Sequence, residues 1–557
     1  MNIVQTLQQA LSQALGAHGV VVDKNSIQLD HPADMSHGDY ATGIALQYAK
    51  QTGKAPKALA DDIVTALGTI EGVSKIEVAG PGFINFTLSA NAVAHTLLTA
   101  LSYENWGVNV YQKGKNVLIE YTDPNPFKAF HIGHLMSNAI GESLSRIIEN
   151  AGAHVTRANY QGDLGVHVAC AIWGIQQLGI HPESADEFGR AYAHGATAYK
   201  ENTDAKSEID TINKKLYDRS DEGINNLYDT GRKESLAAFE KIYTMLGTTF
   251  DHYFFESEAA PVGKEIVLAH PQTFVESDGA RIFKGEEYGL HTRVFINSQG
   301  LPTYEAKELG VTKLKQDLYP ESDQFIVVTA NEIAEYFKVL KKAMEIVFPE
   351  IAEKLLHVPH GFLRLPTGKM SSRTGDVITG ESLLIALAEA ARERASESRA
   401  DDPAILAQQV AVGAIKYQIL RQANGKDIIF DREKALSLEG DSGPYIQYAY
   451  ARACAILTKA GESGVVAKLD ESEAPIHLTR FIYRFPEITE RTVENLAPHT
   501  IANYALLLAA EFNSWYAQVQ VLDETPAAPH KVAIVAATAK TLERCLYLLG
   551  IPAPNKM

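Results

Sequence analysis

The stretch from Asn116 to Tyr160 constrains the fold of this chain more than any other feature. It begins with the short apolar, β-branched run NVLIEYT (Asn116–Thr122), which is typical of a buried parallel strand. The turn Asp123-Pro124-Asn125-Pro126 ends this run, and an amphipathic helix follows as far as the stop signal Asn150-Ala151-Gly152. A second run, HVTRANY, completes a strand–helix–strand unit. The stretch therefore predicts the opening of a doubly wound parallel α/β sheet.

The rest of the chain predicts several domains around this sheet. A length of 557 residues is too great for one ordinary core. The runs RVFIN (293–297) and FIVVT (325–329) fit later strands of the sheet, and the charged, helix-forming segment at about 166–289 fits an insertion. We expect three domains, namely an α+β domain at 1–110, the α/β domain at 111–430 and an all-α helical bundle at 431–557.

Patterns in the first 110 residues are those of a small mixed domain. Helices are expected near 40–48 and 57–67. The segment SKIEVAGPGFINFTL (Ser74–Leu88) alternates in polarity around a Gly-Pro-Gly turn, which predicts a β-hairpin. No pattern in this domain is typical of catalysis, so we expect an accessory or docking role.

Composition argues against several classes of protein. The three cysteines are far apart in sequence and form no Cys-x-x-Cys pair, which disfavours a disulfide scaffold and a thiolate zinc site. No apolar run is long enough to cross a bilayer, and the N-terminus lacks the features of a signal peptide, so we expect a cytoplasmic protein. The net charge of −17 weighs against a nucleic-acid partner, but only weakly, because such binding depends on a local basic surface.

Two histidines lie in the turn after the first strand of the sheet, in His131-Ile132-Gly133-His134. Ligands of open α/β sheets lie at the carboxyl ends of the strands, beside helix N-termini whose free N–H groups attract phosphate. Imidazoles at this place can donate hydrogen bonds to phosphate oxygens as charge builds up in a transition state. Gly133 leaves room for a flat base. Two ordinary surface histidines are the simpler explanation, but the position between a strand and an amphipathic helix favours phosphate binding.

A second candidate segment is Lys369-Met370-Ser371-Ser372-Arg373, which has a glycine on each side, at Gly368 and Gly375. A loop with two cations and two hydroxyls can close over a triphosphate and hold the leaving pyrophosphate. Alone, the segment is equally consistent with a solvated turn. The two segments in this order are much more specific than either of them separately.

The pair of segments predicts an enzyme that consumes ATP. The chain contains neither a Gly-x-x-x-x-Gly-Lys-Ser/Thr loop nor a serine nucleophile elbow, so it matches neither P-loop NTPases nor serine hydrolases of that type. We therefore expect a substrate carboxylate to attack the α-phosphorus of ATP. This reaction needs positioning and charge stabilisation more than it needs a nucleophilic side chain.

Together the two segments resemble the HIGH and KMSKS signatures of class I aminoacyl-tRNA synthetases. The residues around them resemble arginyl-tRNA synthetases along nearly the whole chain. The stretches that carry this resemblance are His37–Tyr40, Gly80–Phe86, Glu120–Asn125 with Lys128, Gly162-Asp163, Phe250-Asp251, Glu256-Ser257, Tyr304–Leu309, Gly443–Tyr448, Phe512–Tyr516 and Leu548–Ile551.

The resemblance implies a function and an architecture. It implies a Rossmann-like catalytic domain at 111–430, an N-terminal additional domain at 1–110 that touches the tRNA elbow, and an anticodon-binding domain at 431–557. It also implies that ATP, accompanied by Mg²⁺, converts L-arginine to arginyl-adenylate, and that arginine then passes to the terminal ribose of tRNA-Arg. Activation of arginine is expected to require bound tRNA, and the family is expected to act as a monomer without a resident metal.

Residue roles follow from the same resemblance. Catalysis is assigned to His131, His134, Lys128, Lys369, Ser371 and Ser372, and ATP binding to His131, Gly133, His134, Lys369, Met370 and Arg373. Arginine binding is assigned to Glu120, Asn125, Tyr304 and Glu308. A guanidinium group is a planar fork of five donors, so carboxylates and a neutral acceptor are suitable partners.

Three departures from the family pattern matter. The second lysine of KMSKS is absent, because the segment ends in Ser372-Arg373, and we hypothesise that Lys128 supplies the missing positive charge. Glu308 stands where the family more often has Asp, so its guanidinium contact could shift by one methylene. The segment Leu164-Gly165-Val166-His167 also differs from most relatives, and no substrate role is assigned to it.

Aromatic side chains of the helical region are candidates for contact with tRNA bases. Unstacked bases are usually held by aromatic stacking and by hydrogen bonds to their edges. The candidates are Tyr445, Gln447, Tyr448 and Trp515. Aromatics at helical spacing are more often core residues than base platforms, so we expect only one or two of them to contact tRNA.

Other functions remain open on the sequence alone. A class I synthetase for glutamate or glutamine would need a cationic pocket instead of Glu120 and Glu308, and one for cysteine would need zinc ligands. A non-catalytic RNA-binding paralogue would tend to lose His131, His134 and Lys369. A small-molecule nucleotidyltransferase shares the His-x-x-His chemistry but has no need of the long helical C-terminal region.

Overall fold

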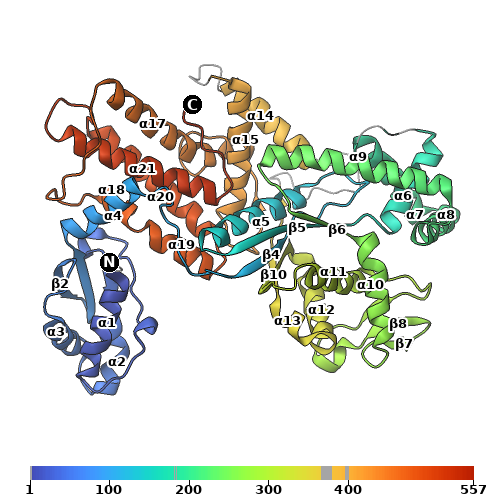
Figure 1. Ribbon diagram of the computed structural model, residues 1–557, viewed down its shortest axis with the longest axis horizontal. Helices are drawn as coiled ribbons and strands as arrows, with labels where there is room; N and C mark the ends of the chain where they lie inside the picture. The colour runs from blue at the N-terminus through green and yellow to red at the C-terminus, as the bar shows by residue number, and fades with distance from the viewer. Residues whose placement is uncertain (1–2, 181, 183–184, 365–378, 395–400) are drawn as a thin grey trace. The chain divides into compact units, whose positions relative to one another are not determined.

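The computed structural model describes residues 3–180, 182, 185–364, 379–394 and 401–557 (Figure 1). These residues form two compact units, each assembled from segments that are distant in sequence. One unit comprises the chain up to Trp106 together with Ala453–Pro486 and Leu508–Leu542. The other comprises Gly107–Arg452, Glu487–Leu507 and Glu543–Met557. We refer to them as the N-terminal unit and the catalytic unit.

A three-stranded antiparallel sheet forms the centre of the α+β part of the N-terminal unit. Its order is β1-β3-β2, with β1 at Tyr40–Thr42, β2 at Val73–Ala79 and β3 at Phe83–Leu88. The predicted hairpin is thus present as β2 and β3. The prediction that a helix begins at residue 40 is wrong, because Tyr40 pairs with Phe86 and α2 begins only at Ile44. Burial of the Tyr40 ring against the sheet outweighs the local helical pattern.

Helices complete the N-terminal unit. They are α1 (Ile3–Gly16), α2 (Ile44–Thr52), α3 (Pro56–Leu67), α4 (Ala90–Ser102) and α18 (His477–Tyr483). Asp39 is buried at the join, where it accepts a hydrogen bond from the backbone N–H of Leu88 at 2.7 Å and forms an ion pair with Arg480 of α18. Arg480, a residue of the helical C-terminal region, thereby packs with the first domain. The predicted domains are consecutive stretches of sequence, so they do not anticipate this contact.

The catalytic unit is built on a parallel five-stranded sheet of order β11-β10-β4-β5-β6. The strands are β4 (Asn116–Glu120), β5 (His154–Gln161), β6 (His252–Phe255), β10 (Gln324–Ala330) and β11 (Leu355–His360). Helix α5 (Ile132–Asn150) connects β4 to β5 and packs across β4, β5 and β10 (Figure 1). The predicted doubly wound α/β sheet is confirmed.

Two details of this sheet differ from the sequence prediction. The run at 293–297 is a strand, β9 (Arg293–Ile296), but it belongs to a separate antiparallel sheet with β7 (Val275–Ser277) and β8 (Ala280–Phe283). The outermost strand β11 was not predicted, and neither was β6, which lies inside the segment predicted as an insertion. The four residues of β6 are too few for a strand pattern to stand out in sequence.

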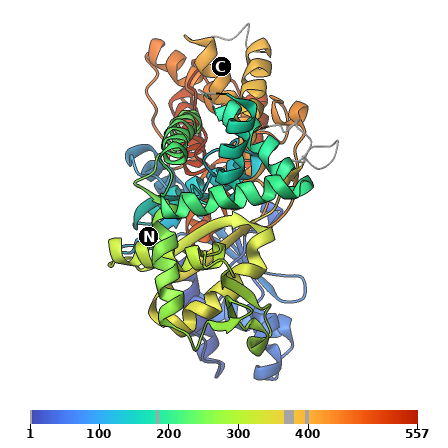
Figure 2. The same cartoon turned by 90° about the vertical axis from the view of Figure 1, so that its right-hand side faces the viewer.

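Two groups of helices surround the strands. One group is α6 (Val166–Leu178), α7 (Ala185–Glu201), α8 (Thr203–Asp218) and α9 (Glu222–Leu246). The other is α10 (Glu256–Ala269), α11 (Tyr304–Leu318), α12 (Ala334–Val347) and α13 (Pro349–Lys354). Figures 1 and 2 show the teal-to-green helices of the first group set apart from the yellow-green helices of the second. Each group therefore has a hydrophobic core of its own.

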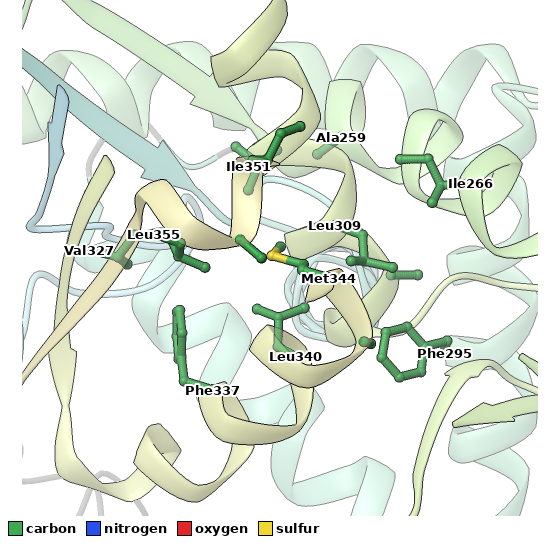
Figure 3. Close-up of a cluster of buried hydrophobic side chains, with 14 of the residues drawn as sticks. Ala259, Ile266, Phe295, Leu309, Val327, Phe337, Leu340, Met344, Ile351 and Leu355 are labelled. Carbon is green, nitrogen blue, oxygen red and sulfur yellow. The ribbon is translucent and has the colours of Figure 1, made fainter. Parts of the chain in front are cut away.

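The core beneath the parallel sheet fixes the strands that carry the site. Figure 3 shows part of it, where Leu340 and Met344 of α12 lie between Val327 of β10 and Phe295 of β9. All of these side chains are almost completely removed from solvent. Full burial of such a side chain contributes about 1.5–3 kcal/mol, so this cluster is a rigid base for the strand ends above it.

The remaining helices are α14 (Gly380–Arg394), α15 (Pro403–Leu420), α16 (Arg432–Ala435), α17 (Gly443–Glu462), α19 (Phe485–Glu494), α20 (Pro498–Gln518) and α21 (Ala528–Leu548). Those after residue 431 lie where an all-α bundle was predicted, whereas α14 and α15 precede it. Parts of α17, α20 and α21 belong to the N-terminal unit. Within the residues that the structure describes, no helix combines the length and apolarity needed to span a bilayer.

Candidate active site

A cavity of about 230 Å³ lies at the carboxyl ends of the parallel strands. Its walls come from the turn after β4, the start of α5, the ends of β5, β10 and β11, and the helices α10 and α11. Seven residues that the sequence predicted for ATP or arginine binding line it together, namely Glu120, Asn125, His131, Gly133, His134, Tyr304 and Glu308. Glu120 and Glu308, which are 188 positions apart in the chain, thus share one cavity.

The backbone of the turn after β4 is strained. Thr122, Asp123 and Phe127 have φ values of 83°, 47° and 67°, in the left-handed region that side chains rarely adopt. For a β-branched residue such as Thr122 this conformation is especially unfavourable. Each such conformation costs about 1–3 kcal/mol of strain energy and persists only when surrounding contacts fix it.

Polar side chains of α5 supply these contacts. Ser137 Oγ accepts a hydrogen bond from the Thr122 N–H at 2.9 Å and donates one to the carbonyl of Val328 at 2.8 Å. Asn138 Nδ2 donates to Thr122 Oγ1, and Asn138 Oδ1 accepts from Thr248 Oγ1, both at 3.0 Å. Because this network is buried, each lost bond would leave an unpaired polar group, and the network holds the turn in its strained form.

One end of the cavity is acidic. Glu120, at the end of β4, forms a completely buried ion pair with Lys315 of α11 at 2.5 Å. Asp123 and Glu308 also line the cavity, and Asp123 Oδ1 accepts a hydrogen bond from the Tyr160 N–H at 2.8 Å. Three carboxylates therefore surround a single lysine. The excess of carboxyl groups favours a cationic ligand at this end.

The crowding of these buried carboxyl groups also raises the pKa values of Glu308 and Asp123. Burial, with the nearby charge of Glu120, raises the pKa of Glu308 to about 8. Burial and Glu120 also raise the pKa of Asp123 well above its ordinary value, although the hydrogen bond from Tyr160 opposes this. Lys315 opposes both shifts, but it is paired with Glu120 and offsets them only in part. A bound guanidinium or ammonium group would return them to the ionised form.

Neutral groups shape the acidic end. The Tyr304 hydroxyl is bonded to the Glu308 carboxylate, and its ring lies 5.0 Å from that of Tyr336. Asn125 lies against Gly162, where an added Cβ would come within 2.1 Å of Asn125 Oδ1. Only glycine therefore leaves the Asn125 amide in place at the cavity wall.

Glu256, at the start of α10, adds a further buried carboxylate to the wall, but it is already paired. Its partner is Lys307, at 2.7 Å. The adjacent Ser257 donates hydrogen bonds through N–H and Oγ to the buried Asp163, both at 2.8 Å. Asp163 also accepts from Tyr228 of α9, so it fastens the start of α10 to the end of β5 and to the helices of the insertion.

The other end of the cavity carries imidazoles at the N-terminus of α5. The rings of His131 and His134 are stacked with their centroids 3.5 Å apart. The backbone N–H of His131 donates to His134 Nδ1 at 3.2 Å, so the neutral His134 carries its proton on Nε2. An added Cβ on Gly133 would lie 2.9 Å from the His131 ring, so glycine is needed for this stacked arrangement.

Both imidazoles are neutral at physiological pH. Burial lowers the pKa of His134 well below its ordinary value, and His131 and Lys128 act in the same direction. His131 is an exposed residue, but the protein packed around its ring and the charge of Lys128 still lower its pKa to about 4. Neutral Nε2–H groups can donate to phosphate oxygens without an added charge.

Lys128 lies beside the cavity and not in its lining. Its Nζ is 4.9 Å from the centroid of the Tyr192 ring, and burial lowers its pKa. The segment Lys369, Met370, Ser371, Ser372 and Arg373 lies outside the described residues. The chain that follows it is fixed near the histidines, because Gly380 N–H donates to Phe130 O at 2.6 Å and Thr379 forms a β-bridge with His131.

The predicted tRNA-contacting residues have different environments. Tyr445, Tyr448 and Trp515 are half-buried, and the Arg452 guanidinium lies 4.7 Å from the Tyr448 ring centroid. Gln447 is completely buried, and its Nε2 donates to two backbone carbonyls, those of Gln409 and Pro552. This placement favours a structural role for Gln447 over contact with a base.

Several residues of the site were given no role from the sequence, namely the cavity-lining Asp123, Glu256 and His360 and the partner of Glu120, Lys315. Asp123 belongs to the turn that was recognised, and its proximity to Glu120 was a usable signal. Lys315 lies two helical turns after Glu308 on the same helix, which places the two on one face. His360 and Glu256 follow other strands, and only the sheet order brings them to the same edge.

Comparisons with known families agree with this geometry. Residues 96–432 match the family described as tRNA synthetases class I (R), catalytic domain. Residues 1–88 match the arginyl tRNA synthetase N terminal domain, and residues 446–557 match the DALR anticodon binding domain.

Individual relatives and a solved structure are similar along almost the whole chain. The arginine–tRNA ligase of Streptococcus agalactiae is 32% identical over 554 aligned positions, with 95% of each chain covered. That of Streptococcus pneumoniae is 31% identical, with both chains fully covered. The arginyl-tRNA synthetase structure of Thermus thermophilus superposes with a TM-score of 0.83 at 27% identity, covering 99% of each chain.

Proposed function

The chain belongs to the arginyl-tRNA synthetases of class I, and from this premise we propose how its cavity divides the reaction. The enzyme is an arginine–tRNA ligase, which uses ATP to activate L-arginine and transfers it to tRNA-Arg. The acidic end of the cavity is proposed to bind arginine, and the imidazole end to bind ATP. The presence of both a set of carboxyl groups and a set of imidazoles in the lining of one cavity is the observation that supports the proposal.

Arginine is bound through its two cationic groups. Glu308 and Glu120 face the guanidinium group, with the Tyr304 hydroxyl as a neutral neighbour, and Asn125 holds the substrate from the turn after β4. Lys315 is paired with Glu120 in the absence of substrate. A glutamate or glutamine substrate fits this end poorly, because its side chain brings no cation to the surplus carboxyl groups.

In the first step, a carboxylate oxygen of arginine attacks the α-phosphorus of ATP, which enters as its Mg²⁺ complex. A bond forms between this oxygen and phosphorus, the bond from phosphorus to the bridging oxygen breaks, and pyrophosphate leaves with the electron pair. His131 and His134 donate to the phosphate oxygens as charge develops on them. Removal of one such donor typically lowers the rate about 10²–10³-fold.

In the second step, a hydroxyl of the terminal ribose of tRNA-Arg attacks the carbonyl carbon of arginyl-adenylate. The new ester bond forms, the bond to the phosphate oxygen breaks and AMP leaves. We propose that the strained turn at Thr122 and Asp123 keeps the acidic end and the histidines in a fixed mutual position through both steps, since such positioning contributes strongly to catalysis.

Lys128 and the segment from Lys369 to Arg373 are proposed to hold the triphosphate. Lys128 lies near both histidines, as their lowered pKa values reflect. The Lys128→Ala variant should show slower pyrophosphate exchange at saturating arginine and tRNA. A rate within twofold of the wild type would remove Lys128 from this role.

For tRNA, the half-buried Tyr445, Tyr448 and Trp515 are the proposed contacts in the helical region, and Gln447 is not retained among them. The first domain is proposed to touch the tRNA elbow. We also propose that the enzyme acts in the cytoplasm and that it is a monomer. Light scattering of the purified protein would test the monomeric state.

The deciding experiment is ATP–pyrophosphate exchange with each amino acid, with and without tRNA-Arg. Arginine in the presence of tRNA should give exchange, and glutamate, glutamine and cysteine should not. Exchange with glutamate and not with arginine would overturn the assignment of the acidic end. Exchange with arginine in the absence of tRNA would overturn only the proposed dependence on tRNA.

A further inference from the structure

The cavity contains a third imidazole, His360, which the division above does not use. His360 is the last residue of β11 and pairs in register with Ala330 at the end of β10. It is only 2% exposed, and it lines the cavity together with His131 and His134. It also belongs to the outermost strand of the sheet order β11-β10-β4-β5-β6, on the side away from β5 and β6.

The hydrogen bonding of His360 fixes its proton. Its Nδ1 lies 2.8 Å from the carbonyl oxygen of Gly361, an acceptor, so Nδ1 carries the hydrogen and Nε2 carries the lone pair. Burial lowers the pKa of His360, which keeps the ring neutral. His134 has the opposite arrangement, with Nε2 as the donor. The two imidazoles therefore present a donor and an acceptor to the same cavity.

The orientation of His360 is held by backbone packing on the segment that follows it. An added Cβ on Gly361 would lie 2.2 Å from the Lys426 carbonyl oxygen, so the two backbones are in close contact. Phe362 N–H donates to Asp427 Oδ1 at 2.9 Å, and Leu363 pairs with Ile428. These contacts fix the backbone that carries the Gly361 carbonyl, to which the His360 ring donates its hydrogen bond.

The neighbours of His360 indicate which part of ATP reaches it. The acidic end is proposed to hold arginine, whose binding ionises Asp123 and Glu308, so the triphosphate does not lie beside these groups, since like charges repel. His360 is next to Ala330, and the cavity is also lined by the neighbouring Val328, Thr329, Glu332 and Ile333. The apolar members of this run suit a flat base or a ribose ring, and a buried polar group beside them needs a hydrogen-bond partner.

We propose that His360 is a nucleoside-binding residue, whose Nε2 accepts a hydrogen bond from the adenosine part of ATP. The donor is the 6-amino group of the base or a hydroxyl of the ribose. The inference rests on the placement of ATP at the imidazole end that is proposed above. The other proposed contacts of ATP are to its phosphates. The His360 contact would let the site discriminate between nucleotides.

The first test is steady-state kinetics of the full-length His360→Phe enzyme with tRNA-Arg. Phenylalanine keeps a flat ring but cannot accept the hydrogen bond. We expect the KM for ATP to rise about 5- to 20-fold, the size expected when a buried donor loses its partner. The kcat and the KM values for arginine and tRNA should stay within about twofold, because none of those groups meets Nε2. His360→Gln, with an amide oxygen near the position of Nε2, should recover part of the affinity.

His270→Phe is a matched control. The His270 Nδ1 is also bonded to a backbone carbonyl, that of Ile266 at 2.8 Å, but His270 lies at the end of α10 and does not line the cavity. This variant should leave the KM for ATP unchanged.

Nucleotide analogues identify the donor and test the wild-type protein directly. Purine riboside triphosphate lacks the 6-amino group, and 2′-deoxy-ATP and 3′-deoxy-ATP each lack one hydroxyl. The analogue without the relevant donor should have a raised KM with the wild type and show little further loss with His360→Phe. This arm remains informative even if a variant fails to fold.

Three results would overturn the inference. They are an unchanged KM for ATP in the His360→Phe enzyme, an equal loss with ATP and all three analogues, and a rise confined to the KM for tRNA. Each presupposes a wild type that activates arginine. A wild type that fails to do so refutes instead the proposed function on which the inference rests.

Discussion

Arginine should bind the enzyme more tightly as the pH rises from 6 to 8. Glu308 has a pKa of about 8 because it is buried beside the carboxylate of Glu120, and Lys315 offsets this only in part. At neutral pH the carboxyl group of the empty cavity is therefore mostly protonated. A guanidinium group beside it favours the ionised form, so arginine binding should release a proton.

The size of the effect follows from this pKa. A group with a pKa of about 8 is roughly 1% ionised at pH 6, about 10% at pH 7 and half ionised at pH 8. Arginine affinity should therefore increase by up to about tenfold per pH unit below pH 8 and level off above it. The same group affects folding with a defined sign. Its stabilising contribution is complete below its ordinary pKa of 4.5 and is lost as the pH rises through about 8, since the folded empty protein retains a proton that the unfolded chain releases.

Isothermal titration of arginine into the enzyme at pH 6, 7 and 8 measures this dependence. Two buffers with different ionisation enthalpies give the number of protons released. The Glu308→Gln variant should bind arginine more weakly at pH 8, with an affinity that changes much less with pH. A wild-type Kd that changes less than twofold between pH 6 and 8, or binding without proton release, would refute the reasoning.

Other variants test the remaining contacts. Lys315→Met leaves Glu120 buried without a partner, so chemical denaturation should show a free energy of unfolding lower by about 3–5 kcal/mol. Adding Glu120→Gln to this variant should recover much of the loss. Asn138→Ala breaks the network over the strained turn and should cost about 1–3 kcal/mol in the same assay, together with a lower kcat. His134→Ala should reduce kcat about 10²–10³-fold in pyrophosphate exchange with little change in the KM for arginine. Gly310→Ala places a Cβ 2.1 Å from a carbonyl oxygen of α10, and its thermal unfolding temperature should fall clearly below that of the wild type, whereas an unchanged temperature would contradict the close packing of α10 on α11.

The sequence was most informative where the relevant signal is local. The strand at 116–120, the turn after it and the helix that begins at Ile132 are specified by neighbouring residues, and the structure has all three in place. The run at 293–297 shows the limit of this approach. Its β-branched and apolar residues correctly predicted a strand, but nothing within five residues decides which sheet the strand will join. The four-residue strand β6 was missed for the related reason that its pattern is too short.

The sequence by itself determined the order of the domains, the family and the positions of the two phosphate-handling segments, because turn chemistry and hydrophobic periodicity act over a few residues. Only the tertiary structure decided that Lys315 pairs with Glu120, that Asp123 and Glu308 share this one cation, and that His360 shares a cavity with His134. These facts depend on which strand ends and helix faces meet. That choice is made by packing over long sequence distances, where burial and the mutual satisfaction of charges and hydrogen bonds select one arrangement.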